Sequence, residues 1–182
     1  MTRPADFIDP ETARTLPGLF RERVRRTPNA CAYRSFTAEE KCCITVSWGE
    51  VAELAARWQA ALRRENLYPG DRAAVMLRNC LEWVLFDLAA QGLGLVTVPL
   101  FVKDRPENFT YILNATGARF LLIEGMEQWR SIEKVDGRLA GIERIVTLEK
   151  VCEKDCDSRL AELSGWLPET DAKYLFDRLW VF

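Results

Sequence analysis

The chain has 182 residues, enough for one domain with a hydrophobic core, and its 48% hydrophobic and 29% charged residues are typical of a globular protein. Its net charge of −2 offers no basic face for nucleic acid. The N-terminus lacks the apolar segment of a signal peptide, and no uninterrupted apolar stretch reaches membrane-spanning length. We therefore expect a cytoplasmic protein that binds no nucleic acid. The arginines between Arg21 and Arg26 are expected to form a solvated face, with peripheral contact to a membrane or a partner as the alternative.

The cysteine and histidine content limits the chemistry. Six cysteines are present, and we expect reduced thiols because disulfides are rare in the cytoplasm. Cys42 and Cys43 would point to opposite faces of a strand, whereas Cys152 and Cys156 could share one helix face. The absence of histidine excludes Ser-His and Cys-His nucleophilic systems and argues against a zinc site.

The N-terminal part predicts one helix after an irregular start. Residues 1–14 show no periodic pattern. Residues 15–26 predict an amphipathic helix with Leu19, Phe20 and Val24 on its apolar face, and Pro28 should end it at the preceding residue.

A hairpin and a long helix are expected next. Residues 30–36 and 42–46 alternate as two strands of a β-hairpin joined by a polar turn over residues 37–41. Ser47 and Glu50 have the spacing of a capping box and open the helix. Its apolar residues recur at helical spacing, and we expect Trp48 to join them in the core: Val51, Leu54, Ala55, Trp58 and Leu62.

The following segment predicts a strand, a helix and a second strand. Residues 72–77 and 95–100 are short apolar runs. Asn79 is expected to cap the helix between them, with Glu82 as its capping-box partner, and Gly92 is expected to end that helix in the left-handed conformation. A unit of this length is a right-handed crossover that joins parallel strands.

The remaining elements continue this alternation. Pro106 suits the first turn of a helix that packs through Phe109, Ile112 and Leu113 and ends near Gly117. Two more strands are expected, over residues 119–123 and 144–148. One helix is expected between them, over residues 127–134, and another after them, over residues 157–167. The pattern predicts an α/β fold with a doubly wound, largely parallel sheet, flanking helices and an N-terminal β-hairpin.

One loop has the character of a ligand site. Arg78 and Asn79 follow a strand and precede a helix, where backbone N–H groups can hold an anion. The alternative is that Asn79 only caps the helix and Arg78 only faces solvent. Gly92 and Gly94 follow a helix and precede a strand, which reverses the order of a dinucleotide-binding fingerprint, and no glycine-rich loop with lysine is present. The carboxylates Glu39 and Glu40 are expected to be solvated.

Five segments in a fixed order carry a family resemblance: residues 16–28, 45–55, 68–83, 89–100 and 107–119. Together they resemble the N-terminal portion of AMP-forming acyl-CoA synthetases, which belong to the adenylate-forming superfamily. Within this family, the segments resemble the long-chain fatty acid–CoA ligases most. The resemblance implies a two-step reaction. A fatty carboxylate attacks ATP in the presence of Mg²⁺ to give an acyl-adenylate and pyrophosphate, and the thiol of coenzyme A then displaces AMP.

The resemblance also predicts which segments of the family's enzymes are missing from this chain. The family's phosphate-binding loop and its later segments have no counterpart here, so no catalytic, cofactor-binding or metal-binding residue is assigned. We expect residues 1–14 to be irregular, residues 15–170 to form a partial AMP-binding domain, and residues 171–182 to be an unmatched apolar tail.

Three interpretations of the function remain open at this point. The first is an inactive fragment of a long-chain fatty acid–CoA ligase, partnered by the remainder of the enzyme or by a second copy of itself. The second is a freestanding, non-catalytic binding or scaffold module that uses the sheet surface and the aromatic tail near Trp180. A small-ligand binder at Arg78 and Asn79 is the third and weaker interpretation.

Overall fold

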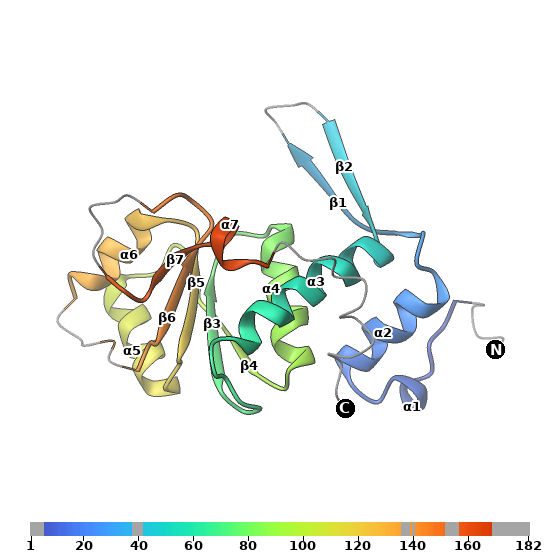
Figure 1. The fold of residues 1–182 in the computed structure, drawn as a ribbon, viewed down its shortest axis with the longest axis horizontal. Coiled ribbons are helices and arrows are strands. Elements are labelled where there is room, and N and C mark those ends of the chain that lie inside the picture. Colours follow the sequence, from blue (N-terminus) through green and yellow to red (C-terminus); the bar gives the residue numbers. More distant parts are fainter. Residues whose placement is uncertain (1–5, 38–41, 136–138, 140, 152–156, 169–182) are drawn as a thin grey trace.

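The computed structural model describes residues 6–37, 42–135, 139, 141–151 and 157–168. These residues form an α/β fold with a five-stranded parallel sheet and a two-stranded antiparallel hairpin (Figure 1). The helices are α1 (Pro10–Ala13), α2 (Leu16–Arg26), α3 (Trp48–Arg63), α4 (Leu81–Gly92), α5 (Pro106–Thr116), α6 (Met126–Glu133) and α7 (Leu163–Trp166). The strands are β1 (Cys31–Thr37), β2 (Cys42–Ser47), β3 (Arg72–Met76), β4 (Val96–Pro99), β5 (Phe120–Ile123), β6 (Arg144–Thr147) and β7 (Leu160–Glu162).

The strand order of the larger sheet is β4-β3-β5-β6-β7, and every neighbouring pair is parallel. The chain runs outward from β3 to β4 through α4 and returns past β3 to β5 through α5. The direction of winding therefore reverses between β3 and β5. In open α/β sheets this switch point, at the carboxyl ends of the strands, is where ligands bind.

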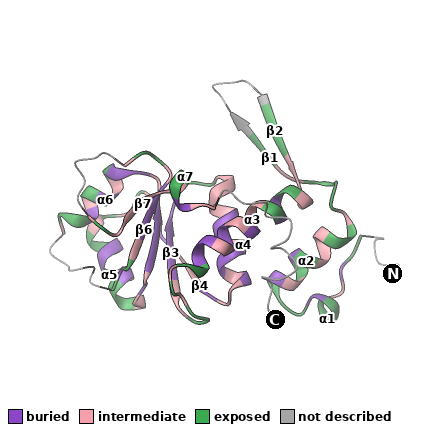
Figure 2. Cartoon of the chain, viewed as in Figure 1, coloured by how far each residue is buried: buried purple, intermediate pink, exposed green. Residues whose placement is uncertain are grey.

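Helices cover both faces of the sheet, which confirms the predicted doubly wound architecture (Figure 1). One core lies between the sheet and the α3–α4 layer and includes Trp58 and Phe86. The other lies on the α5–α6 side and includes Phe109 and Trp129. All four residues of β5 are buried, as expected for a central parallel strand, and Figure 2 shows the buried residues concentrated along the central strands and the helices beside them.

The predicted hairpin and capping box are confirmed. β1 and β2 pair in antiparallel register. The Ser47 backbone N–H donates to Glu50 Oε2 at 2.7 Å, and the Glu50 N–H donates to Ser47 Oγ at 3.3 Å. Trp48 is partly buried, with its ring 6.1 Å from Phe20 and 5.9 Å from Tyr33. On α3 the expected face is buried except at Leu54, which is partly buried.

The N-terminal segment is not irregular throughout, because residues 10–13 form the one-turn helix α1. Asp9 caps it by accepting a hydrogen bond from the Glu11 N–H at 3.0 Å. α1 lies against the first turn of α2 at Gly18, where an added Cβ would lie 1.9 Å from the carbonyl oxygen of Ala13. A glycine is therefore required at this close approach.

The predicted last residue of α4, Gly92, is confirmed, but the predicted N-cap and the predicted left-handed residue are each displaced. Cys80, not Asn79, is the N-cap residue, and it makes no side-chain capping bond. Because the helix begins one residue later than predicted, Glu82 is its second residue and cannot close a capping box. Gly92 is the last helical residue, and the left-handed conformation occurs at Gly94, with a φ of 71°. The predicted stop at Gly117 is confirmed, with a φ of 61°.

The predicted helix over residues 157–167 is wrong. Residues 160–162 form β7, which pairs in parallel with β6, and only the four residues of α7 are helical. Of the apolar residues that predicted a helix face, Leu160 belongs to strand β7 and Trp166 is buried in the core. The predicted turn at 38–41, Cys152, Cys156 and the tail at 171–182 lie outside the described residues.

Trp166 holds this last segment to the core. Its ring lies 5.7 Å from Trp58 and 5.5 Å from Phe120, and only 6% of the residue is exposed. The indole N–H donates to Glu65 Oε1 at 2.7 Å, while Glu65 Oε2 lies 2.8 Å from Arg144 Nε. One side chain thus closes the apolar layer and satisfies its own polar group.

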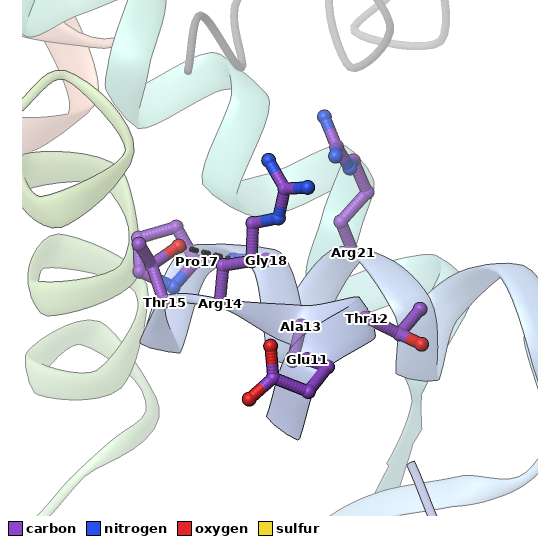
Figure 3. A pocket seen from close by; sticks show the side chains of 8 residues that line it. All are labelled: Glu11, Thr12, Ala13, Arg14, Thr15, Pro17, Gly18 and Arg21. Carbon is purple, nitrogen blue, oxygen red and sulfur yellow. Dashed lines mark hydrogen bonds between the residues drawn. The ribbon is translucent and has the colours of Figure 1, made fainter. Parts of the chain in front are cut away.

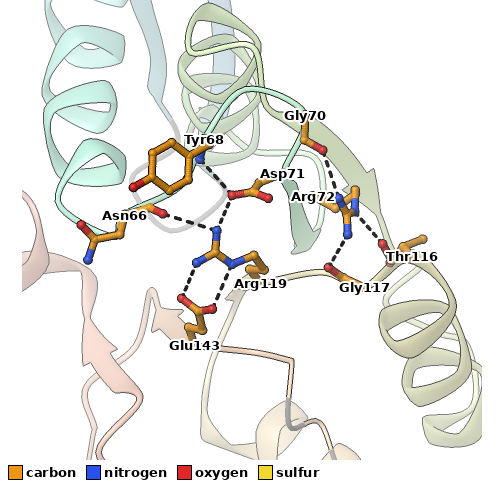
Figure 4. A network of polar contacts seen from close by, with 9 residues as sticks. All are labelled: Asn66, Tyr68, Gly70, Asp71, Arg72, Thr116, Gly117, Arg119 and Glu143. Atoms are coloured by element: carbon orange, nitrogen blue, oxygen red, sulfur yellow. Dashed lines mark hydrogen bonds and ion pairs between the residues drawn. The ribbon is translucent and has the colours of Figure 1, made fainter.

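A polar network ties together the amino ends of the strands (Figure 4). The Arg119 guanidinium forms ion pairs with Asp71 and with Glu143, the latter at 2.8 Å. Arg72 donates to the carbonyl oxygens of Thr116 at 2.6 Å and Gly117 at 3.0 Å. A cation at this position satisfies the last carbonyl groups of α5 and opposes the negative end of its dipole.

We expect Trp166→Ala to lower the free energy of unfolding by about 3–5 kcal/mol, because the substitution opens a cavity beneath α7 and leaves the Glu65 carboxylate without the indole donor. Urea denaturation followed by circular dichroism measures the change. Tyr111→Ala, at a side chain that is 73% exposed, is the control and should change stability by less than about 0.5 kcal/mol. Equal effects of the two substitutions would contradict the anchoring role.

We also expect the charge of Asp71 to stabilise the fold in a pH-dependent way. The Tyr68 N–H, which donates to Asp71 at 2.9 Å, and the Arg119 guanidinium lower the pKa of this carboxyl. Its contribution is therefore complete above its unfolded-state pKa of about 3.9 and is lost as the pH falls through the lower folded-state pKa. Wild type should be more stable than Asp71→Asn at neutral pH, and the gap in unfolding free energy should close in acid. Urea titrations at several pH values test this, and a gap that does not change with pH would refute it.

Candidate functional site

Arg78 stands where the sequence predicted, at the carboxyl end of β3 beside the switch point. Its guanidinium is paired with Glu124, which directly follows β5, through a contact of 3.1 Å between Nε and Oε1 and a second one through Nη2. The hydrogen bonds that Arg78 donates to the Glu124 carboxylate raise the pKa of Arg78. This ion pair joins the ends of two neighbouring strands, and the Arg78 side chain that forms it is 75% exposed.

A second carboxylate lies at the same edge of the sheet. Glu149 follows β6 and packs against Gly125, the N-cap residue of α6, where an added Cβ would lie 1.9 Å from Glu149 Oε2. The backbone N–H of Glu124 donates to Gln128 Oε1 at 2.7 Å. The start of α6 therefore faces a carboxylate of the chain itself.

These side chains do not fit a triphosphate and its magnesium ion. A triphosphate needs free cations and open N–H groups, whereas this edge presents the carboxylates of Glu124 and Glu149, and Arg78 is paired with Glu124. Within the residues that the structure describes, no group of three or more histidine, cysteine, aspartate or glutamate side chains could hold a metal ion. Neither interpretation of this loop describes it fully: Arg78 forms an ion pair with Glu124 while remaining largely exposed, and Asn79 does not cap α4.

Sequence reasoning missed Glu124 and Glu149 because it did not give the strand order. Each residue follows a predicted strand in the way that Arg78 follows β3. Only the neighbouring positions of β3, β5 and β6 bring the three side chains to one edge. The sequence does show that each of these residues comes just after a predicted strand. It does not show that the three strands are neighbours in the sheet, and this neighbourhood is what brings the residues together.

An apolar groove of about 570 Å³ opens beside this edge, between the hairpin and the start of α4. Its lining comes from β1 and β2 on one side and from the first residues of α4 on the other: Tyr33, Arg34, Ser35, Ile44, Val46, Asn79, Cys80, Leu81, Glu82 and Val84. Burial raises the pKa of the Cys80 thiol and that of the Tyr33 hydroxyl. The groove therefore offers apolar contact surface and a thiol that is disfavoured as a nucleophile.

A second hollow, of about 340 Å³, lies between α1 and α2 (Figure 3). Arg14 and Arg21 extend from one side of it, and the Glu11 carboxylate points away from them. The other arginines of α2 are engaged within the chain: Arg25 and Arg26 pair with Glu22, Arg23 donates to the carbonyl of Asp6, and Arg26 also donates to that of Phe7. The basic segment is thus a largely exposed face tied to the N-terminal segment, and this hollow is remote from the carboxyl edge of the sheet.

No helix among the described residues is long and apolar enough to cross a membrane.

A family model described as AMP-binding enzyme matches residues 20–174. The chain is 27% identical over 109 residues to 4-coumarate–CoA ligase 2 of Oryza sativa subsp. japonica, a match that covers 57% of this chain and 19% of the ligase. It is 34% identical over 94 residues to the long-chain-fatty-acid–AMP ligase FadD26 of Mycobacterium tuberculosis, covering 50% of this chain and 16% of that protein. An uncharacterized protein of the same species is 23% identical over 149 residues, covering 82% of this chain and 81% of that protein.

Solved structures share the fold. Coronafacic acid ligase from Pectobacterium brasiliense superposes with a TM-score of 0.73 at 16% identity, covering 87% of this chain and 30% of that one. The N-terminal domain of FACL13 from Mycobacterium tuberculosis gives a TM-score of 0.64 at 19% identity, covering 71% of this chain and 32% of that one. The chain therefore spans less than a third of these ligases. Because the family match covers residues 20–174, the chain belongs to the family of AMP-binding enzymes, the adenylate-forming ligases.

Proposed function

We propose that this chain is part of the large domain of a long-chain fatty acid–CoA ligase, with residues 15–170 as a partial AMP-binding domain. The complete enzyme would adenylate a fatty acid with ATP and Mg²⁺ and then transfer the acyl group to coenzyme A. The family match over residues 20–174 carries this proposal, and the 34% identity to a long-chain-fatty-acid–AMP ligase supports the substrate class.

The proposed role of this chain is structural support for the reaction. Its parallel sheet supplies a rigid scaffold, and its carboxyl edge supplies Glu124 and Glu149 beside an engaged Arg78. A triphosphate placed there would be repelled by the two carboxylates, and Arg78 is already paired with one of them. We infer that the groups that bind ATP belong to the part of such ligases that this chain does not span, and that the chain alone is inactive.

We further propose a cytoplasmic setting for the protein. The thiols of Cys31, Cys43 and Cys80 are free, as expected for a protein kept in a reducing compartment.

A second candidate function is a freestanding binding or scaffold module. One observation favours it: the match to the uncharacterized mycobacterial relative covers 81% of that protein, whereas this chain covers less than a third of the ligases. In this alternative the apolar groove and the sheet surface would contact a protein partner, and the chain would take no part in a reaction of ATP.

We expect the purified chain to show no ATP–pyrophosphate exchange with a long-chain fatty acid and Mg²⁺, and no heat of binding when titrated with ATP in the millimolar range. A complete long-chain acyl-CoA ligase assayed in parallel is the positive control, and circular dichroism confirms that the chain is folded. Exchange above background, or saturable ATP binding, would overturn the assignment as inactive.

A further inference from the structure

The β1–β2 hairpin is a sheet of only two strands. In the part of the chain that the structure describes, no third strand pairs with it, and in Figure 1 it projects from the body near the start of α3. A two-stranded hairpin is at best marginally stable in water, and its outer edges present unpaired N–H and C=O groups. Another strand could satisfy these groups.

The edge formed by β2 lacks the features that usually prevent such pairing. Residues 42–47 contain no charged residue, no proline and no glycine. Ile44, Thr45 and Val46 are β-branched and favour extended backbone. Cys43, Ile44 and Thr45 are exposed, with Ile44 at 44%. A six-residue, uncharged strand of this composition is prone to pair with another strand.

The other described strand edges differ from β2. In the larger sheet, β4 has four residues and ends in Pro99, which has no N–H to donate, and β7 has only three residues. In the hairpin, β1 carries the exposed cation Arg34 near its middle. Short length, proline and charge all discourage edge pairing. β2 is therefore the edge with the least protection.

The base of β2 continues into the apolar groove. Ile44 and Val46 line the groove together with Leu81 and Val84 of α4. A strand added beside β2 would bring further apolar side chains to the groove's rim and remove part of Ile44 from water, which favours association.

We propose that the outer edge of β2 pairs antiparallel with β2 of a second copy of this chain, so that two hairpins form one continuous sheet about a two-fold axis. In such an interface each residue near the axis faces its own copy, so a charged strand would repel itself. β2 has no charge and is self-complementary through its backbone. This inference does not depend on the ligase assignment.

The test is sedimentation velocity over a series of protein concentrations, with a reducing agent present to exclude disulfides. We expect the weight-average mass of the wild type to rise from that of one chain toward that of two. The variant Cys43→Glu/Thr45→Glu should keep the mass of one chain throughout, because the carboxylates repel across the axis. Within the hairpin, the residue at position 45 lies opposite Arg34, so the new charge there is favourable to the hairpin itself.

A matched control carries the same change in charge elsewhere. Phe101→Glu/Tyr111→Glu alters two side chains that are 71% and 73% exposed and belong to neither strand of the hairpin, and this variant should associate like the wild type. A wild type that stays monomeric would overturn the proposal, and so would a β2 variant that still dimerises, a control variant that does not, or masses beyond the dimer.

Hydrogen exchange on the wild type provides a test that needs no variant. The backbone amides of residues 43–46 should exchange more slowly as the protein concentration rises, while those of α5 should not change. Concentration-independent exchange in β2 would refute the proposed interface.

Discussion

The structure depends on the burial of β5 between two layers of helices. A central parallel strand has no face for water, so both of its faces need apolar cover. On one side Phe120 stacks against Phe86, with ring centroids 5.8 Å apart, and contacts Trp166. On the other side Leu121 and Ile123 join the core beneath α5 and α6. This requirement explains why a short C-terminal segment folds back onto the sheet: without Trp166, part of the covered face would be open.

The two ends of the sheet use charge differently. At the amino ends, Arg72 donates to a carbonyl oxygen at the end of α5, and Arg119 pairs with the carboxylates of two loops that lead into strands. These charges stabilise the scaffold. At the carboxyl ends, Arg78 pairs with Glu124 across the switch point. Both ends are therefore internally satisfied. At the switch point, where open α/β sheets bind ligands, this chain places an ion pair of its own side chains.

Local sequence patterns predicted most of the elements because they report local physics. The capping box at Ser47 and Glu50, the stop at Gly117 and the alternation of strands and helices all depend on residues close in the chain. The wrong predictions, in contrast, concern residues whose structure depends on contacts with distant parts of the chain. Leu160 and Trp166 have helical spacing, but pairing with β6 and insertion beside Phe120 override it. The pairing of Arg78 with Glu124 connects residues 46 positions apart, and no local pattern encodes the order of the strands.

The charges at the switch point also affect the stability of the scaffold. Like charges at one edge of a sheet repel one another, and an opposite charge beside them offsets this repulsion. Here Arg78 pairs with Glu124, so the attraction joins the ends of β3 and β5. Along the hairpin, which pairs with no third strand among the described residues, backbone N–H and C=O groups of the outer edges remain to be paired.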